Sequence, residues 1–159
     1  MGCGQIAILG QYQKKIDPKT EVTSADIYDD FIENAKKNVI ENDLDLRFVK
    51  TDMFSNINEK FDLITFNPPY VPLNYKKKAI KYEKISFSGK EGTDAINAFL
   101  KDGKKYLNQN GLIFLGVNLF YVPKDILIKI VNFHNFKINE IKLNKETPLE
   151  KIYNWYVLN

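Results

Sequence analysis

Hydrophobic residues follow two different spacings along the chain, and the two spacings alternate. Apolar residues with a helical period predict helices, whereas short continuous runs of Val, Ile, Leu and Phe predict buried strands. Helices are expected at residues 5–16, 28–40, 93–107 and 123–133. Strands are expected at residues 21–26, 46–50, 61–66, 111–117, 136–143 and 153–158. The chain is therefore predicted to adopt an α/β fold.

The order of these elements predicts a Rossmann-like, doubly wound and mostly parallel sheet. Strands that alternate with helices form parallel sheets with right-handed crossovers. The last two expected strands, 136–143 and 153–158, have no helix between them. They are therefore expected to form an antiparallel C-terminal hairpin at one edge. Because the pattern shows neither a repeat nor a linker, residues 1–159 are expected to form a single domain.

The beginning of the chain predicts that one strand of this sheet is missing. Gly2 and Gly4, in the sequence MGCG, make a tight turn of the kind that follows a strand, yet no strand precedes them. A sheet without its central strand would leave unpaired backbone groups in the core. We therefore expect the first strand to be absent through N-terminal truncation, or through a start codon assigned too late.

Composition excludes some classes of protein. The chain is 44% hydrophobic and 13% aromatic, which is enough to bury a core. It has no apolar run near the roughly 18 residues that a membrane-spanning helix requires. The single cysteine, Cys3, excludes an internal disulfide framework and disfavours a zinc site built from cysteines. We expect a cytoplasmic protein with no metal site and no membrane partner.

The positive charge of the chain comes almost entirely from lysine. The net charge is +3, and Arg47 is the only arginine. Arginine is the side chain preferred for bidentate contacts to phosphate and guanine. This composition therefore disfavours a protein that recognises nucleic acid. Residues 74–90 nevertheless contain six lysines, one glutamate and three interleaved aromatic residues. That segment could bind nucleic acid, help to dock a protein, or form a solvated loop.

Three expected strand ends carry groups that suit a cofactor containing adenosine. Gly2 and Gly4 would let the backbone approach a ligand at a helix N-terminus. Asp26 lies 22 residues after Gly4, close to the spacing at which a carboxylate reaches ribose hydroxyls. Asp52 follows the next strand at the same expected sheet edge. The alternatives are that Asp26 caps the helix that begins near Tyr28, and that Asp52 is a turn residue.

The sequence Asn67-Pro68-Pro69-Tyr70 directly follows an expected buried strand and is the most specific feature of the chain. Pro68 would hold a rigid turn and still offer its carbonyl oxygen as an acceptor. Asn67 offers a side-chain oxygen. Two acceptors can hold the two protons of a planar NH₂ group while Tyr70 stacks on its flat face. This arrangement predicts catalysis by orientation and electrostatic complementarity.

This constellation resembles the class I methyltransferases that modify planar amino groups with S-adenosylmethionine. Within that group, Asn-Pro-Pro-Tyr is shared by the HemK/PrmC type, which modifies glutamine, and by adenine-amino methyltransferases of DNA and RNA. Residues 88–92, SGKEG, are similar to the Gly-Gly-x-Asp-Gly segment of HemK-type enzymes, with Ser88 in place of a glycine and Glu91 in place of the aspartate. The similarity favours the HemK/PrmC type. The resemblance includes no counterpart of the helical N-terminal domain of bacterial PrmC enzymes, so the single-domain archaeal and eukaryotic relatives are expected to be the nearer match.

The resemblance implies methylation of the glutamine of a Gly-Gly-Gln tripeptide in a peptide-chain release factor. The alternative is an adenine N6-methyltransferase acting on RNA or DNA, and a third possibility is a module without catalysis that works through a partner. The implied catalytic residues are Asn67, Pro68, Pro69 and Tyr70. The implied residues for S-adenosylmethionine are Gly2, Gly4, Asp26, Ile27, Asp52, Met53 and Asn67.

The glycine turn departs from the family pattern at two positions, and the resemblance also implies a partner subunit. The acid expected two residues before Gly2 is absent, and Ile6 stands where a third glycine is common. Both departures weaken the expected cofactor site. Single-domain relatives are often paired with a small zinc-binding activator subunit that covers an apolar sheet edge. The same pairing is expected here if residues 46–50 form an edge strand with Phe48 exposed.

Overall fold

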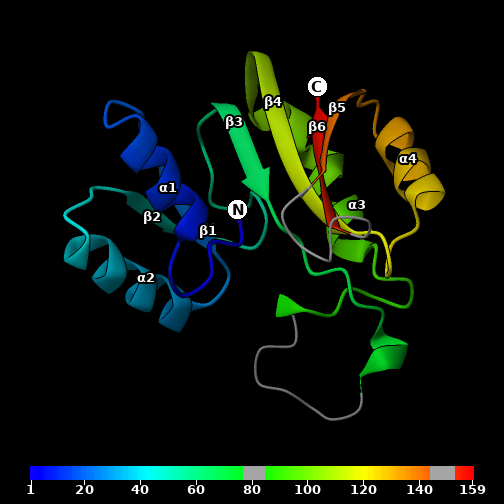
Figure 1. The fold of residues 1–159 in the computed structure, drawn as a ribbon, viewed down its shortest axis with the longest axis horizontal. Coiled ribbons are helices and arrows are strands. Elements are labelled where there is room, and N and C mark those ends of the chain that lie inside the picture. The colour runs from blue at the N-terminus through cyan, green and yellow to red at the C-terminus, as the bar shows by residue number, and fades with distance from the viewer. Residues whose placement is uncertain (77–84, 144–152) are drawn as a thin grey trace. The chain divides into compact units, whose positions relative to one another are not determined.

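A computed structural model of the chain describes residues 1–76, 85–143 and 153–159. The chain divides into two compact units, Met1–Glu59 and Lys60–Asn159, each of which is described by itself (Figure 1). The prediction of a single domain stays a prediction.

The first unit is a short βαβ arrangement preceded by a helix. Its elements in order are α1 (Ile8–Ile16), β1 (Thr23–Asp26), α2 (Asp29–Glu41) and β2 (Arg47–Lys50). The two strands are parallel, with Thr23 opposite Arg47 and Asp26 opposite Lys50. Helix α2 connects them and buries one face, formed by Phe31, Ile32, Ala35 and Val39. These spacings of one, three and four residues place the apolar side chains on one side of a helix.

The second unit is built on a mixed four-stranded sheet. Its strands are β3 (Phe61–Phe66), β4 (Leu107–Asn118), β5 (Ile138–Leu143) and β6 (Tyr153–Leu158), in the order β3-β4-β6-β5. Strands β3 and β4 are parallel, whereas β6 is antiparallel to both β4 and β5. The expected antiparallel C-terminal hairpin is therefore confirmed.

Helices and turns complete the second unit. They are η1 (Leu73–Tyr75), α3 (Asp94–Gly103), η3 (Lys104–Tyr106) and α4 (Lys124–Phe133). The core combines alternate residues of β4 with the apolar faces of the two α-helices. Its fully buried side chains include Ile96, Phe99, Ile113, Leu115, Leu127 and Tyr156.

Several element boundaries differ from the sequence-based expectation. The first helix begins at Ile8, because residues 4–6 form a turn. The helix expected to reach residue 107 ends at Gly103, where a 3₁₀ turn leads into β4. The strand expected from residue 111 begins at Leu107, which pairs with Phe61.

Candidate functional site

In the first unit, the glycine turn is tied to the end of β1. The Gly4 N–H donates to the Asp26 carboxylate (2.9 Å), and the Cys3 N–H donates to the carbonyl oxygen of Ala25 (2.9 Å). Gly4 has a φ of +64°, and an added Cβ would meet no atom within 4 Å. Glycine is therefore required there for its backbone conformation, and the space beside the turn is open.

Asp26 lies at the centre of a set of backbone hydrogen bonds. Besides Gly4, its carboxylate accepts the N–H groups of Ile27 (2.8 Å) and Tyr28 (3.2 Å). The side chain is buried, and Ile27 and Tyr28 both precede α2, which begins at Asp29 without a side-chain cap bond, so Asp26 does not cap the helix. A carboxylate can accept about four hydrogen bonds, so capacity for one ligand hydroxyl remains.

The thiol beside this turn is not suited to act as a nucleophile. Burial, followed by the nearby charge of Asp26, raises the pKa of Cys3 to about 12. Burial also lowers the pKa of the Met1 ammonium group. A thiol with so high a pKa stays protonated at neutral pH, and the thiolate is the reactive form.

Asp52 and Met53 lie in the turn that follows β2. The Thr51 N–H donates to the carbonyl oxygen of Asp26 (2.8 Å), so the ends of β1 and β2 lie side by side, as expected for parallel strands. The Thr51 hydroxyl donates to the Met53 carbonyl oxygen (2.9 Å). Met53 has a positive φ of 49°, and the Asp52 side chain is exposed.

In the second unit, the Asn-Pro-Pro-Tyr segment follows the last residue of β3. Asn67 is exposed, Pro68 is buried, and Pro69 and Tyr70 are half-buried. A second segment is hydrogen-bonded beside the residues that come next. The Val71 N–H donates to Ser86 (2.8 Å), the Ser88 N–H donates to Val71 (3.0 Å) and the Leu73 N–H donates to Gly89 (2.9 Å), in each case to the carbonyl oxygen.

The SGKEG residues have structural roles that explain their types. Gly92 has a φ of +74°, and an added Cβ would overlap the carbonyl oxygen of Tyr70. Ser88, which stands where HemK-type enzymes have glycine, accepts the Ala95 N–H on its hydroxyl (2.7 Å). This bond satisfies a free N–H in the first turn of α3. Thr93, the residue directly before α3, makes no side-chain cap bond, so Ser88 has that role.

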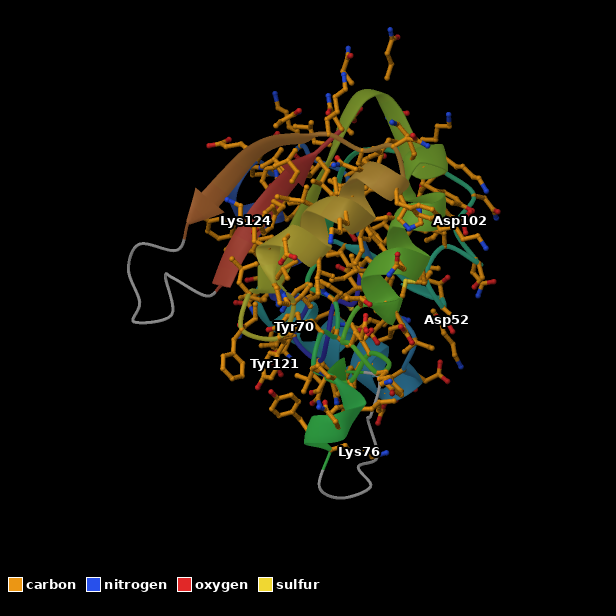
Figure 2. The ribbon with its side chains drawn as sticks, turned by 90° about the vertical axis from the view of Figure 1, so that its right-hand side faces the viewer. Asp52, Tyr70, Lys76, Asp102, Tyr121 and Lys124 are labelled. Atoms are coloured by element: carbon orange, nitrogen blue, oxygen red, sulfur yellow. The ribbon has the colours of Figure 1, made fainter. Side chains whose placement is uncertain are left out.

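Tyr70 belongs to a group of aromatic residues that the sequence did not reveal. Its ring stacks on Tyr121, with centroids 6.1 Å apart and an interplanar angle of 23°. Figure 2 shows these two labelled side chains next to one another. Burial, followed by the neighbouring Tyr121, raises the pKa of the Tyr70 hydroxyl, so it remains protonated at neutral pH. A usable signal existed, because Tyr121 follows a predicted strand end, where ligands bind in α/β folds.

The structure thus groups the predicted residues within each unit. The first unit brings Gly4, Asp26 and Ile27 into direct contact and places Asp52 and Met53 after the neighbouring strand. The second unit holds residues 67–70 as one segment. Strand β2 pairs only with β1 among the described strands, but Phe48 is half-buried, so the exposure on which an activator subunit was predicted is incomplete.

The described residues show neither a metal-binding cluster nor a membrane-spanning helix. Among residues 1–76, 85–143 and 153–159, no group of His, Cys, Asp and Glu side chains is arranged to hold a metal ion. No helix within those ranges has the length and apolar character needed to cross a membrane.

Comparison with known proteins identifies relatives of the chain. The methyltransferase small domain family matches residues 1–143. A bifunctional methyltransferase from Rickettsia bellii is 34% identical over 149 residues, which cover 88% of this chain and 26% of that protein. A candidate protein N5-glutamine methyltransferase from Methanocaldococcus jannaschii is 29% identical, over 83% of this chain and 66% of that protein. A ribosomal RNA small subunit methyltransferase C from Actinobacillus pleuropneumoniae is 30% identical, over 90% of this chain and 39% of that protein.

The chain therefore spans between about a quarter and two thirds of the length of these curated relatives. Among solved structures, a ribosomal protein L11 methylase from Lactobacillus delbrueckii matches with a TM-score of 0.72 at 19% identity. That match covers 99% of this chain and 66% of the other. It confirms the Rossmann-like α/β fold of class I methyltransferases that the sequence predicts.

Proposed function

The chain belongs to the methyltransferase small domain family, and we propose that it transfers a methyl group from S-adenosylmethionine to the nitrogen of a planar NH₂ group. One observation carries this proposal: residues 67–70 follow β3 directly, with Asn67 exposed and Tyr70 half-buried beside it. An acceptor amide, a proline carbonyl and an aromatic face suit a flat group with two N–H protons.

The proposed catalysis works by orientation. The Asn67 side-chain oxygen and the Pro68 carbonyl oxygen accept the two N–H protons, which turns the nitrogen lone pair toward the methyl donor. Tyr70 packs on the flat face of the substrate. The raised pKa of its hydroxyl keeps it neutral, so Tyr70 does not act as a base. Developing positive charge on the nitrogen strengthens both hydrogen bonds during transfer, and one N–H proton is lost to water once the methyl group is attached.

The first unit supplies the residues proposed for the cofactor. The open space beside Gly4 and the remaining acceptor capacity of Asp26 fit a ligand that carries ribose hydroxyls. Ile27, Asp52 and Met53 lie at the ends of the same two strands. When bound, S-adenosylmethionine supplies a methyl group on a positively charged sulfur.

We propose the glutamine side chain of a release factor as the accepting group. Support comes from the N5-glutamine relative, of which the chain covers the largest share among the three relatives above. Further support comes from Gly92, which lies against the Tyr70 carbonyl oxygen, so the two segments on which the resemblance to HemK-type enzymes rests are in contact in this chain.

A second candidate is the exocyclic amino group of a base, such as adenine, in RNA or DNA. The relative named as a ribosomal RNA methyltransferase supports it, as does the stacked pair of Tyr70 and Tyr121. A base and an amide are both flat and both present an NH₂ group, so residues 67–70 suit either one.

Radiolabelled methyl transfer separates the two candidates. The purified chain would be incubated with labelled S-adenosylmethionine and either a release factor or total RNA. We expect label on the release factor, in the peptide that contains Gly-Gly-Gln. Label on RNA alone would exclude the glutamine proposal and support the base. Label on neither substrate, from a chain that binds the cofactor, would contradict methyl transfer to these groups.

A further inference from the structure

The second unit exposes a cluster of apolar side chains next to Tyr70. We call the cluster formed by Tyr75, Phe120 and Tyr121 the aromatic surface. Phe120 is 62% exposed and Tyr75 is 51% exposed. Single exposed apolar residues are normal in a protein, but a contiguous group of them usually marks a binding site.

Ordered turns hold these rings in place. The Asn118 side-chain oxygen, at the end of β4, accepts the Phe120 N–H (2.9 Å), and its carbonyl oxygen accepts the N–H groups of Tyr121 and Val122. The Tyr75 N–H donates to the carbonyl oxygen of Pro72 (3.0 Å) within η1. The exposed rings are therefore presented by a fixed backbone, which lowers the entropy that binding would cost.

Tyr121 is the centre of the aromatic surface. The ring of Tyr75 meets it edge-on at 5.5 Å and 85°, and the ring of Phe120 does so at 5.0 Å and 87°. Tyr121 also stacks on Tyr70. The aromatic surface is thus continuous with the segment proposed to hold the accepting group.

Positive charge flanks the aromatic surface. Lys76 directly follows Tyr75, and Lys124 begins α4, three residues after Tyr121. In the view of Figure 2 these two lysines lie on either side of Tyr70 and Tyr121. Lys124 is exposed and Lys76 is half-buried, and Asp125, which follows Lys124, offsets part of this positive charge. This charge suits a polyanion and disfavours a purely apolar peptide.

We propose that the aromatic surface binds single-stranded nucleic acid. Bases stack on the exposed rings of Tyr75 and Phe120, and the flanking lysines contact the phosphates. Stacking on aromatic side chains combined with a basic surface is the general mode of binding single strands. The proposal goes beyond methyl transfer, because it concerns a surface and not the accepting nitrogen.

Fluorescence anisotropy tests the proposal without the cofactor. The probes are fluorescein-labelled 12-nucleotide oligouridine RNA and oligothymidine DNA, which separate the two sources of a single strand. We expect Phe120→Ala and Tyr75→Ala each to weaken binding about tenfold, because each removes one stacking ring. Tyr75→Phe keeps the ring and should retain binding. Lys124→Ala should weaken binding and reduce its dependence on salt concentration.

The matched control is Phe133→Ala, which removes another exposed phenylalanine (78%) at the other end of α4. Its affinity should equal that of the unmodified chain. If Phe120→Ala and Tyr75→Ala also bind like the unmodified chain, or if Phe133→Ala weakens binding equally, the aromatic surface is not the site. Because no cofactor is present, such a failure leaves the proposed methyl transfer standing. Failure of methyl transfer to both substrates likewise leaves this binding test unaffected.

Discussion

The two prolines after β3 lack a backbone N–H donor, and the residues on either side of them carry the side chains proposed to hold the substrate. Asn67 and Tyr70 flank a rigid pair that still presents a carbonyl oxygen, and Gly92 packs against the backbone of Tyr70. Sequence alone predicted the two acceptors, because the chemistry of Asn and Pro depends on the residue itself and not on distant contacts. It did not identify Tyr121, because the stacking partner of Tyr70 is set by the tertiary fold and not by neighbouring residues.

The contact at Gly92 predicts a strong effect of a single methyl group. Gly92→Ala combines a positive φ with overlap of the Tyr70 carbonyl oxygen, so we expect a loss of about 3 kcal/mol in the free energy of unfolding. Gly4→Ala has a similar φ but open space around the Cβ, and about 1–2 kcal/mol is expected. Urea unfolding measures both variants. Equal losses of unfolding free energy in Gly92→Ala and Gly4→Ala would show that the Cβ of residue 92 does not overlap the Tyr70 carbonyl oxygen.

Cys3 gives a chemical test of the glycine turn. With a pKa of about 12, the folded thiol should react with a disulfide reagent at pH 8 at least about 100-fold more slowly than in the chain unfolded by urea. The folded pKa lies above the ordinary value of 9.0, so the associated stability is complete below pH 9 and is lost as the pH rises toward 12. Similar rates in both states would mean that the turn leaves Cys3 exposed and ionised.

At the scale of elements, the interiors were predictable, and so were both ends of β3 and β6, but several other ends were not. The apolar runs of β3 and β4 are long enough to identify buried strands, and α2 has a clear one-sided apolar pattern. The ends depend on local contacts that leave little trace in the sequence. Helix α1 begins after a turn in which Ala7 has a positive φ, and α3 is capped from Ser88, outside the helix.

Removing that cap should affect the stability of the second unit. Ser88→Ala leaves the Ala95 N–H without its acceptor, and we expect a loss of about 1 kcal/mol in the free energy of unfolding. The matched control is Ser86→Ala, two residues earlier in the same segment, where the backbone carbonyl makes the bond to Val71. It should change stability by less than about 0.5 kcal/mol. If the control costs as much as Ser88→Ala, the hydroxyl of Ser88 does not cap α3.

At the scale of the whole molecule, the alternation of strands and helices was enough to predict the fold class. The Rossmann-like fold and the C-terminal hairpin are confirmed. The described strands form two sheets, β1-β2 and β3-β4-β6-β5, whereas one sheet lacking its first strand was expected. The missing strand therefore stays a prediction, as do the roles of the individual site residues.

The sequence and the fold are compatible with both candidate accepting groups. An amide and an adenine amino group have the same local shape, and residues 67–70 suit both. The aromatic surface adds a property that the motif alone does not carry, because it lies outside the Asn-Pro-Pro-Tyr segment. Binding and methyl transfer are therefore best measured separately.

The central claim is that Asn67 orients a planar NH₂ group for methyl transfer. The most direct test is the single-turnover rate of labelled methyl transfer to the release factor by Asn67→Ala, with cofactor affinity measured in parallel. The matched control is Asn132→Ala, an exposed asparagine on α4. We predict a rate about 100-fold lower for Asn67→Ala, a change in cofactor affinity below about tenfold, and an unchanged control. A rate equal to that of the unmodified chain would contradict the claim.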